Sequence, residues 1–124
     1  MVLMDSAADV FYHDVPEPAR SRCIAMLGKH PLDANLTPVK HIGYDHVPST
    51  YIMTTLDRAI VHDYQKWAIE RLQSRAHERV AAGEAVTVPF TGPLGEFSIE
   101  SGHSPMVAKP EELAGILGRI AEGI

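Results

Sequence analysis

The chain has 124 residues, of which 45% are hydrophobic and 22% are charged, as expected for one globular domain with a modest core. Its formal net charge of -5 at pH 7 argues against a nucleic-acid partner, because phosphate binding requires clustered Lys and Arg. The single cysteine, Cys23, excludes an intramolecular disulfide framework, and we expect it to fill the core. We see no apolar stretch long enough for a bilayer and no leader pattern, so we expect no membrane partner and a cytoplasmic location.

The pattern in residues 1–47 predicts short helical pieces separated by irregular structure. Pro16 and Pro18 precede a helix expected from about residue 18 to Gly28, where glycine ends it. Cys23, Ile24 and Leu27 give this helix an apolar stripe. Residues 30–48 are rich in Pro, Gly, Asn, Asp and His, which predicts irregular structure with one helical turn.

Residues 49–55 are β-rich and predict a short buried strand, which places Asp57 in the loop at the strand's C-terminal end. A long helix is expected over residues 59–83. Tyr64 and Trp67 are interpreted as core side chains of this helix rather than as a platform for a ligand. The expected apolar face of the helix comprises Ile60, Tyr64, Trp67, Ala68 and Leu72.

Residues 86–90 and 96–100 form two further β-rich runs around the turn-forming sequence TGPLG, which predicts a hairpin or a bent strand. The following loop holds His103, and a helix is expected over residues 109–123. Its expected inner face comprises Leu113, Ile116, Leu117 and Ile120.

Strand, helix, strand, helix is the order of a parallel βαβ unit, in which functional groups gather at the C-terminal ends of the strands. The predicted fold class is therefore α/β, as a single domain over residues 1–124 with two or three strands flanked by helices. Asp57 and His103 each follow a predicted strand. We expect them to meet at the same edge of the sheet.

Three segments of the chain resemble the C-terminal region of α/β-hydrolases, in particular the branch of methylesterases, hydroxynitrile lyases and related fungal proteins. They are VPSTYIMTTLDRAI followed by Gln65 and Trp67, SGHSPMVAKPEELAGIL, and FYHDVPEPA. The resemblance implies a cap-like segment over residues 1–47 and a catalytic strand-helix-strand-helix unit over residues 48–124. It implies that Asp57 corresponds to the acid of a catalytic triad and His103 to its base, with no cofactor.

The nucleophile half of that family is absent from the sequence. The family's serine lies in a G-x-S-x-G turn, and none of the serines here has that glycine frame: Ser6, Ser21, Ser49, Ser74, Ser98, Ser101 and Ser104. The stretch from Val86 to Glu100 also exceeds the family's usual strand before the histidine, which suggests an added hairpin. A sheet without its first strands exposes a backbone edge and apolar helix faces, so we expect a homo-oligomer or a complementary chain to complete the fold.

The resemblance further implies a substrate pocket. Tyr12 and His13, with Asp14 beside them, would line this pocket under the cap, and the alternative for this segment is a turn with local hydrogen bonds. Met106 is also expected to line the pocket. The cluster of His41, Asp45 and His46 lacks helical spacing and a third ligand, so no metal site is expected.

Three functions remain open at this point. The first is a small-molecule enzyme of secondary metabolism that uses the His103–Asp57 pair for acid-base chemistry without a serine nucleophile, as a lyase, isomerase, dehydratase or cyclase. The second is the C-terminal part of a serine esterase or lactonase whose nucleophile lies on another chain. The third is a non-catalytic remnant that serves as a binding module.

Overall fold

The computed structural model describes residues 4–29, 31–90 and 96–123. In chain order the elements are α1 (Met4–Phe11), α2 (Ala19–Ala25), α3 (Leu32–Leu36), the 3₁₀ turn η1 (Gly43–Asp45), β1 (Met53–Thr54), α4 (His62–Ala81), β2 (Ser98–Ile99), α5 (Pro105–Ala108) and α6 (Pro110–Glu122). Helices joined to a small parallel sheet confirm the mixed α/β class predicted from the sequence.

The sheet consists of β1 and β2, which pair in parallel with Met53 opposite Ser98 and Thr54 opposite Ile99. Both central side chains, Met53 and Ile99, are only 1% exposed. Backbone pairing continues past the strands, because the Leu56 amide donates to the Ser101 carbonyl at 3.1 Å. The two loops that leave the sheet therefore start side by side.

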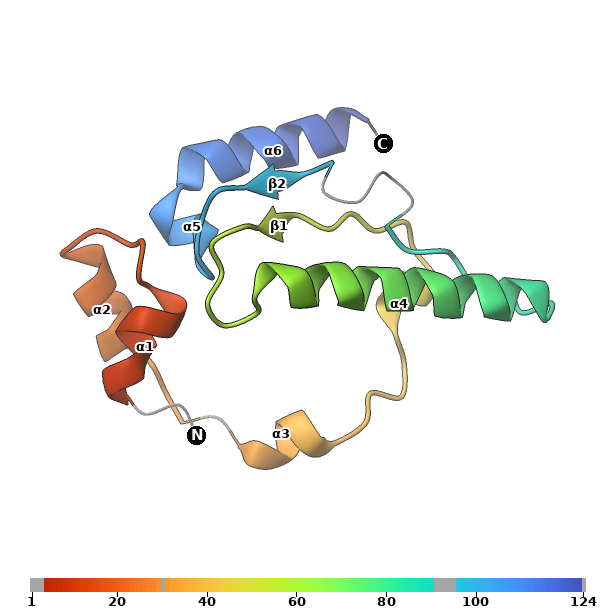
Figure 1. The fold of residues 1–124 in the computed structure, drawn as a ribbon, viewed down its shortest axis with the longest axis horizontal. Helices are drawn as coiled ribbons and strands as arrows, with labels where there is room; N and C mark the ends of the chain where they lie inside the picture. Colours follow the sequence, from red (N-terminus) through yellow and green to blue (C-terminus); the bar gives the residue numbers. More distant parts are fainter. Residues whose placement is uncertain (1–3, 30, 91–95, 124) are drawn as a thin grey trace.

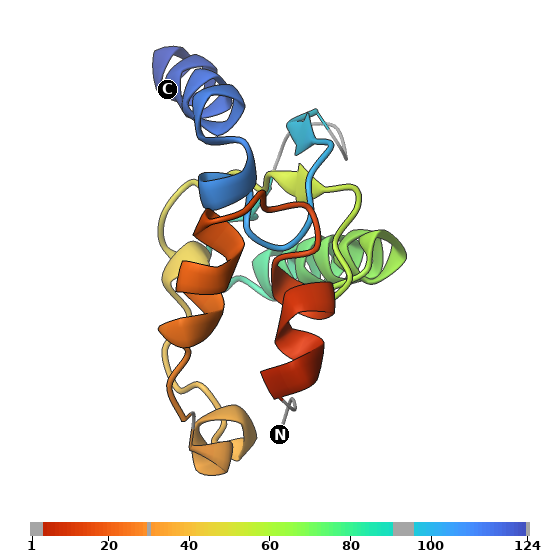
Figure 2. The same cartoon turned by 90° about the vertical axis from the view of Figure 1, so that its left-hand side faces the viewer.

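Helices cover this sheet as a βαβ connection requires. Figure 1 shows α6, β2, β1 and α4 in that order from top to bottom, with both strands pointing toward α1 and α5. Figure 2, turned by 90°, shows α1 beside α2 and places α3 farthest from the sheet. The C-terminal ends of the strands thus face the N-terminal helices.

Helix α4 confirms the expected long helix, but the predicted inner face is wrong. Its buried residues are Gln65, Ile69 and Ala76, whereas Tyr64 and Trp67 are 55% and 52% exposed. The two aromatic rings lie 5.2 Å apart, on a surface that also borders a groove lined by Trp67, Glu70, Arg71, Ser74, Arg75 and Glu78. A two-stranded sheet is narrow, so it covers one stripe of the helix and leaves the aromatic stripe to solvent.

Helix α6 shows the same partial coverage. Ile116 is 3% exposed, as expected for an inner position, while Leu117 is 52% exposed and was placed inward wrongly. Leu113 and Ile120 are half-buried. Ile116 is the one buried residue described in α6, so the inner stripe of this helix is mostly half-buried.

The strand or hairpin expected over residues 86–90 does not form. Pro89 has no amide to donate, and Phe90 has a positive φ of 56°, which few residues other than glycine adopt in a strand. The Thr87 and Phe90 amides donate instead to the Asp45 and Ser49 carbonyls at 2.7 and 3.2 Å. The TGPL residues 91–94 of the expected turn, with Gly95, lie outside the described ranges.

The N-terminal segment contains a helix, α1, that the sequence pattern did not predict. Its alanines favour helix, and Ala7 is 2% exposed, as is Val15 beyond the helix end. The expected helix near residues 18–28 is present as the shorter α2. Glu17 accepts hydrogen bonds from the Ser21 hydroxyl and the Arg20 side chain at 2.7 and 3.0 Å, which stabilises the start of α2.

Candidate functional site

Asp57 lies in the turn that follows β1, where its carboxylate organises the local backbone. Oδ1 accepts hydrogen bonds from the Ala59 and Ile60 amides at 2.8 and 2.9 Å. Oδ2 accepts one from the Thr54 hydroxyl at 3.0 Å. This is the local pattern of an aspartate that builds its own turn, and it fixes the direction in which the carboxylate points.

His103 approaches the same carboxylate from the loop after β2. Its Nδ1 lies 3.0 Å from Asp57 Oδ2 and 3.2 Å from Asp57 Oδ1. The Asp57 side chain is 5% exposed and the His103 side chain 33% exposed. The predicted contact between Asp57 and His103 is confirmed, with the acid buried and one part of the imidazole ring open to solvent.

The protonation of this pair follows from its contacts. Burial alone would raise the pKa of Asp57, but hydrogen bonds from the Ile60 amide, the His103 ring and neighbouring donors outweigh burial and hold the pKa below its ordinary value of 3.8. An ionised carboxylate only accepts hydrogen bonds, so Nδ1 of His103 carries the proton. In a neutral imidazole Nε2 is then the acceptor. Burial raises the pKa of nearby Tyr51, and the charge on Asp57 raises it further.

Gln65 supports the pair from α4. It is 2% exposed, and its amide pairs with the backbone of Thr54: the Thr54 amide donates to Oε1 at 3.1 Å and Nε2 donates to the Thr54 carbonyl at 2.9 Å. Nε2 also donates to the Ile60 carbonyl at 2.7 Å. The side chain therefore pairs with Thr54 on the edge of β1 that faces away from β2, and it holds both ends of the Asp57 turn. The sequence pattern placed the apolar face of this helix elsewhere, so it gave no signal for the buried role of Gln65.

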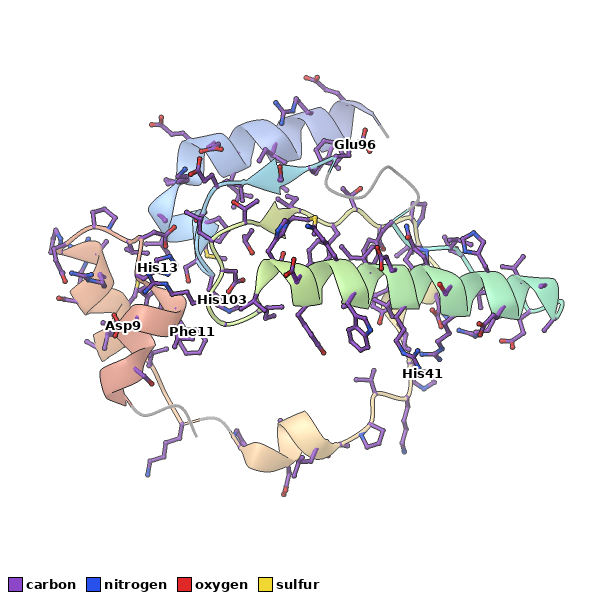
Figure 3. The ribbon with its side chains drawn as sticks, in the orientation of Figure 1. Asp9, Phe11, His13, His41, Glu96 and His103 are labelled. Atoms are coloured by element: carbon purple, nitrogen blue, oxygen red, sulfur yellow. The ribbon has the colours of Figure 1, made fainter. Side chains whose placement is uncertain are left out.

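The end of α1 reaches the same site. The ring centroids of Phe11 and His103 lie 5.3 Å apart, and Figure 3 shows Phe11 and His13 near His103. Tyr12, predicted to bind substrate, is half-buried and its ring packs against Phe11 at 6.3 Å. Phe11 was not singled out in the sequence, because an apolar residue at a helix end gives no signal of a distant partner.

His13 and Asp14 pack against the loop that carries His103. Asp14 Oδ2 accepts hydrogen bonds from the Gly102 amide and the Ser101 hydroxyl at 2.6 and 2.8 Å. His13 Nδ1 is buried and has no hydrogen-bond partner within the described ranges. Both residues lie close to Gly102, and the contacts of Asp14 with Ser101 and Gly102 are long-range contacts that a local turn would not make.

The remaining candidates lie on other elements of the fold. Met106 is in α5 and 60% exposed. Figure 3 places His41 at the opposite side of the molecule from His103, and Asp45 forms an ion pair with Arg79. Across the part of the chain that the structure describes, no group of three or more His, Cys, Asp or Glu could hold a metal ion.

Several serine hydroxyls are committed elsewhere. Ser101 donates to Asp14, Ser74 to the Glu70 carbonyl at 2.9 Å, and Ser49 to the Val47 carbonyl at 3.2 Å. Ser104, directly after His103, is 7% exposed. None of the helices described combines the length and apolar character needed to cross a bilayer.

Comparison of the chain with protein-family models, with curated proteins and with solved structures found no match.

Proposed function

We propose that this chain is an α/β-hydrolase-like unit in which His103 and Asp57 perform acid-base chemistry on a small organic substrate without a serine nucleophile. The observation that carries the proposal is the 3.0 Å contact between His103 Nδ1 and the buried Asp57 carboxylate. An imidazole that is oriented by a buried acid and is partly exposed to solvent is the arrangement that general acid-base catalysis requires.

In the proposed mechanism, Nε2 of His103 removes a proton from the substrate, and the imidazolium that forms is stabilised by Asp57. The bond to the leaving group then breaks, and the imidazolium returns the proton to the leaving group. A lyase or dehydratase follows this sequence directly. An isomerase or cyclase returns the proton to a different atom of the same molecule.

The side chains around the pair favour an apolar substrate. Leu56 and Ile60 flank Asp57 in the chain and are 47% and 41% exposed, and Met106 follows His103. Pockets for small molecules combine such apolar walls with a few placed polar groups. We therefore propose Phe11, Tyr12 and Met106 as the apolar wall and His13 as a second polar group beside His103.

The alternative is the C-terminal part of a serine esterase or lactonase whose nucleophile lies on another chain. The exposed apolar stripe on α4 favours a covering partner in either case, because Val61, Tyr64 and Trp67 are each more than half exposed. We propose that a second copy or a complementary chain covers this stripe. A non-catalytic binding module is the outcome if no activity is found.

The test measures turnover of two probe classes by the whole chain: cleavage of an aryl cyanohydrin or a β-hydroxyketone, and hydrolysis of a p-nitrophenyl ester. If the pair is catalytic, His103→Ala should lower the activity by about 10² to 10⁴, the usual weight of acid-base catalysis. Asp57→Asn should also lower it through loss of tautomer control. His41→Ala is the matched control, since His41 is exposed and remote from the pair.

The results separate the candidates. Full activity in both His103→Ala and Asp57→Asn refutes the acid-base role. Covalent labelling of a serine in this chain by a fluorophosphonate probe refutes the absence of a serine nucleophile. Ester hydrolysis that appears only after a second chain is added, with the label on that chain, establishes the esterase alternative instead.

A further inference from the structure

Asp14 joins two segments that are far apart in the sequence. It lies between α1 and α2, and its Oδ2 accepts hydrogen bonds from the Gly102 amide at 2.6 Å and the Ser101 hydroxyl at 2.8 Å. Ser101 is fully buried. The two donors immediately precede His103, so Asp14 holds the backbone from which the His103 side chain projects.

Gly102 makes this approach possible. A Cβ at this position would lie 2.6 Å from Asp14 Oδ1 and 2.6 Å from His13 Cε1, which is closer than real Cβ contacts. Any larger residue would push Asp14 away from the loop. The glycine and the aspartate therefore fit as a pair.

The same helix end also contacts the imidazole ring itself. Phe11 packs against the His103 ring with a centroid separation of 5.3 Å, while Asp57 binds Nδ1. The ring is thus held by the acid and by an aromatic side chain, and its backbone is held by Asp14. Figure 3 shows that Phe11, His13 and His103 gather at one place in the fold.

We propose that Asp14 is a positioning residue that sets the orientation of His103 relative to Asp57 by anchoring the Ser101–Gly102 backbone. This inference rests on the proposed function, in which His103 is the base. Charge-assisted hydrogen bonds are about twice as strong as neutral ones, and Asp14 is ionised when it makes them. Burial would raise the pKa of Asp14, but the hydrogen bonds from Gly102 and Ser101, with lesser contributions, hold the pKa below its ordinary value.

The test reads the imidazole directly and needs no substrate. ¹⁵N-labelled protein reports the His103 tautomer through its two ring nitrogen resonances, which are widely separated when the proton is fixed on Nδ1. Asp14→Ala removes the acceptor of both hydrogen bonds, so the two resonances should move toward each other as the ring samples other orientations. Asp14→Asn keeps an oxygen acceptor and should restore most of the wild-type separation. Asp9→Asn is the matched control, because Asp9 is an exposed acid on α1.

Activity gives a second readout once a substrate is found by the assays above. Misplacement of a catalytic group by about 1 Å costs on the order of 10²-fold, so Asp14→Ala should lower kcat by about 10 to 10²-fold. KM should stay within about twofold, because Asp14 acts on the base and not on substrate binding. A residue that only stabilises the fold would lower the midpoint of unfolding and leave kcat of the folded protein unchanged.

Unchanged His103 resonances in folded Asp14→Ala would overturn the inference and reduce Asp14 to a structural anchor. If Asp14→Ala does not fold, Ser101→Ala removes one of the two donors and should produce a smaller shift in the same direction; no shift in that variant overturns the inference equally. Failure of the proposed function is distinguishable from failure of this inference. Full activity in His103→Ala refutes the acid-base role, whereas the effect of Asp14 on the His103 resonances is measured independently of activity.

Discussion

Replacing Gln65 by leucine should loosen the turn that carries Asp57. The wild-type amide bonds to the Thr54 amide, carbonyl and hydroxyl and to the Ile60 carbonyl at 2.7 to 3.2 Å. Leucine has a similar volume, so packing is largely kept, but it satisfies none of these groups. The change therefore isolates the hydrogen bonds from the contribution of burial.

The expected loss follows from which groups stay buried. A buried polar group left without a partner costs about 1 to 3 kcal/mol. The Thr54 amide and carbonyl point away from β2, because the neighbouring amides of Met53 and Thr55 are the ones that bond to β2 and its flank. Ile60 is 41% exposed, so its carbonyl can accept a hydrogen bond from water after the substitution. With Thr54 half-buried, we expect a total loss of about 2 to 4 kcal/mol in the free energy of unfolding.

Urea unfolding followed by far-ultraviolet circular dichroism measures this loss, provided that the slope m is unchanged. Glu70→Leu is the control on the same helix, since Glu70 is exposed, and it should change the free energy of unfolding by no more than about 0.5 kcal/mol. Gln65→Glu should be worse than Gln65→Leu at pH 7, because a carboxylate repels the Thr54 and Ile60 carbonyls. A loss below about 1 kcal/mol for Gln65→Leu would show that the side chain is dispensable at the sheet edge and would refute the reasoning.

Three further predictions follow from other contacts. The pKa of Asp57 is lowered in the folded state, so the carboxylate should contribute to stability above the ordinary pKa of 3.8, and this contribution should be lost as the pH falls through the folded pKa. Over that pH range the urea midpoint should fall more steeply for the wild type than for Asp57→Asn. Parallel curves for the two proteins would contradict this prediction. Gly102→Ala should destabilise the fold by about 1 to 3 kcal/mol through overpacking against Asp14 and His13, whereas Gly118→Ala, where a Cβ meets nothing within 4 Å, should be neutral or stabilising in the same urea assay. If a second copy covers the exposed stripe on α4, sedimentation at micromolar concentration should show a dimer that Trp67→Glu dissociates; a monomeric wild type that stays well folded would argue against self-association.

Local patterns in the sequence were sufficient for the strand, helix, strand and helix that carry Asp57 and His103, and for the meeting of these two residues. The apolar periodicity predicted α4 and α6, and the β-rich runs before Asp57 and His103 predicted a parallel pair whose ends bring these residues together. These inferences succeed because strand and helix periodicities are local. A right-handed βαβ connection then restricts where the two loops can emerge.

Tertiary contacts decided the rest. Composition predicted a strand over residues 86–90, but Pro89 and the backbone of Phe90 divert that segment to the loop before β1. The apolar pattern assigned Trp67 to the core, yet the sheet has two strands in the described part of the chain, and Gln65 is buried instead. The contacts of Phe11 and Asp14 with the His103 loop join residues about ninety positions apart, and no local propensity encodes such a distance. The sequence determined which groups are available, and the contacts of Phe11 and Asp14 with the loop after β2 determined which of them meet.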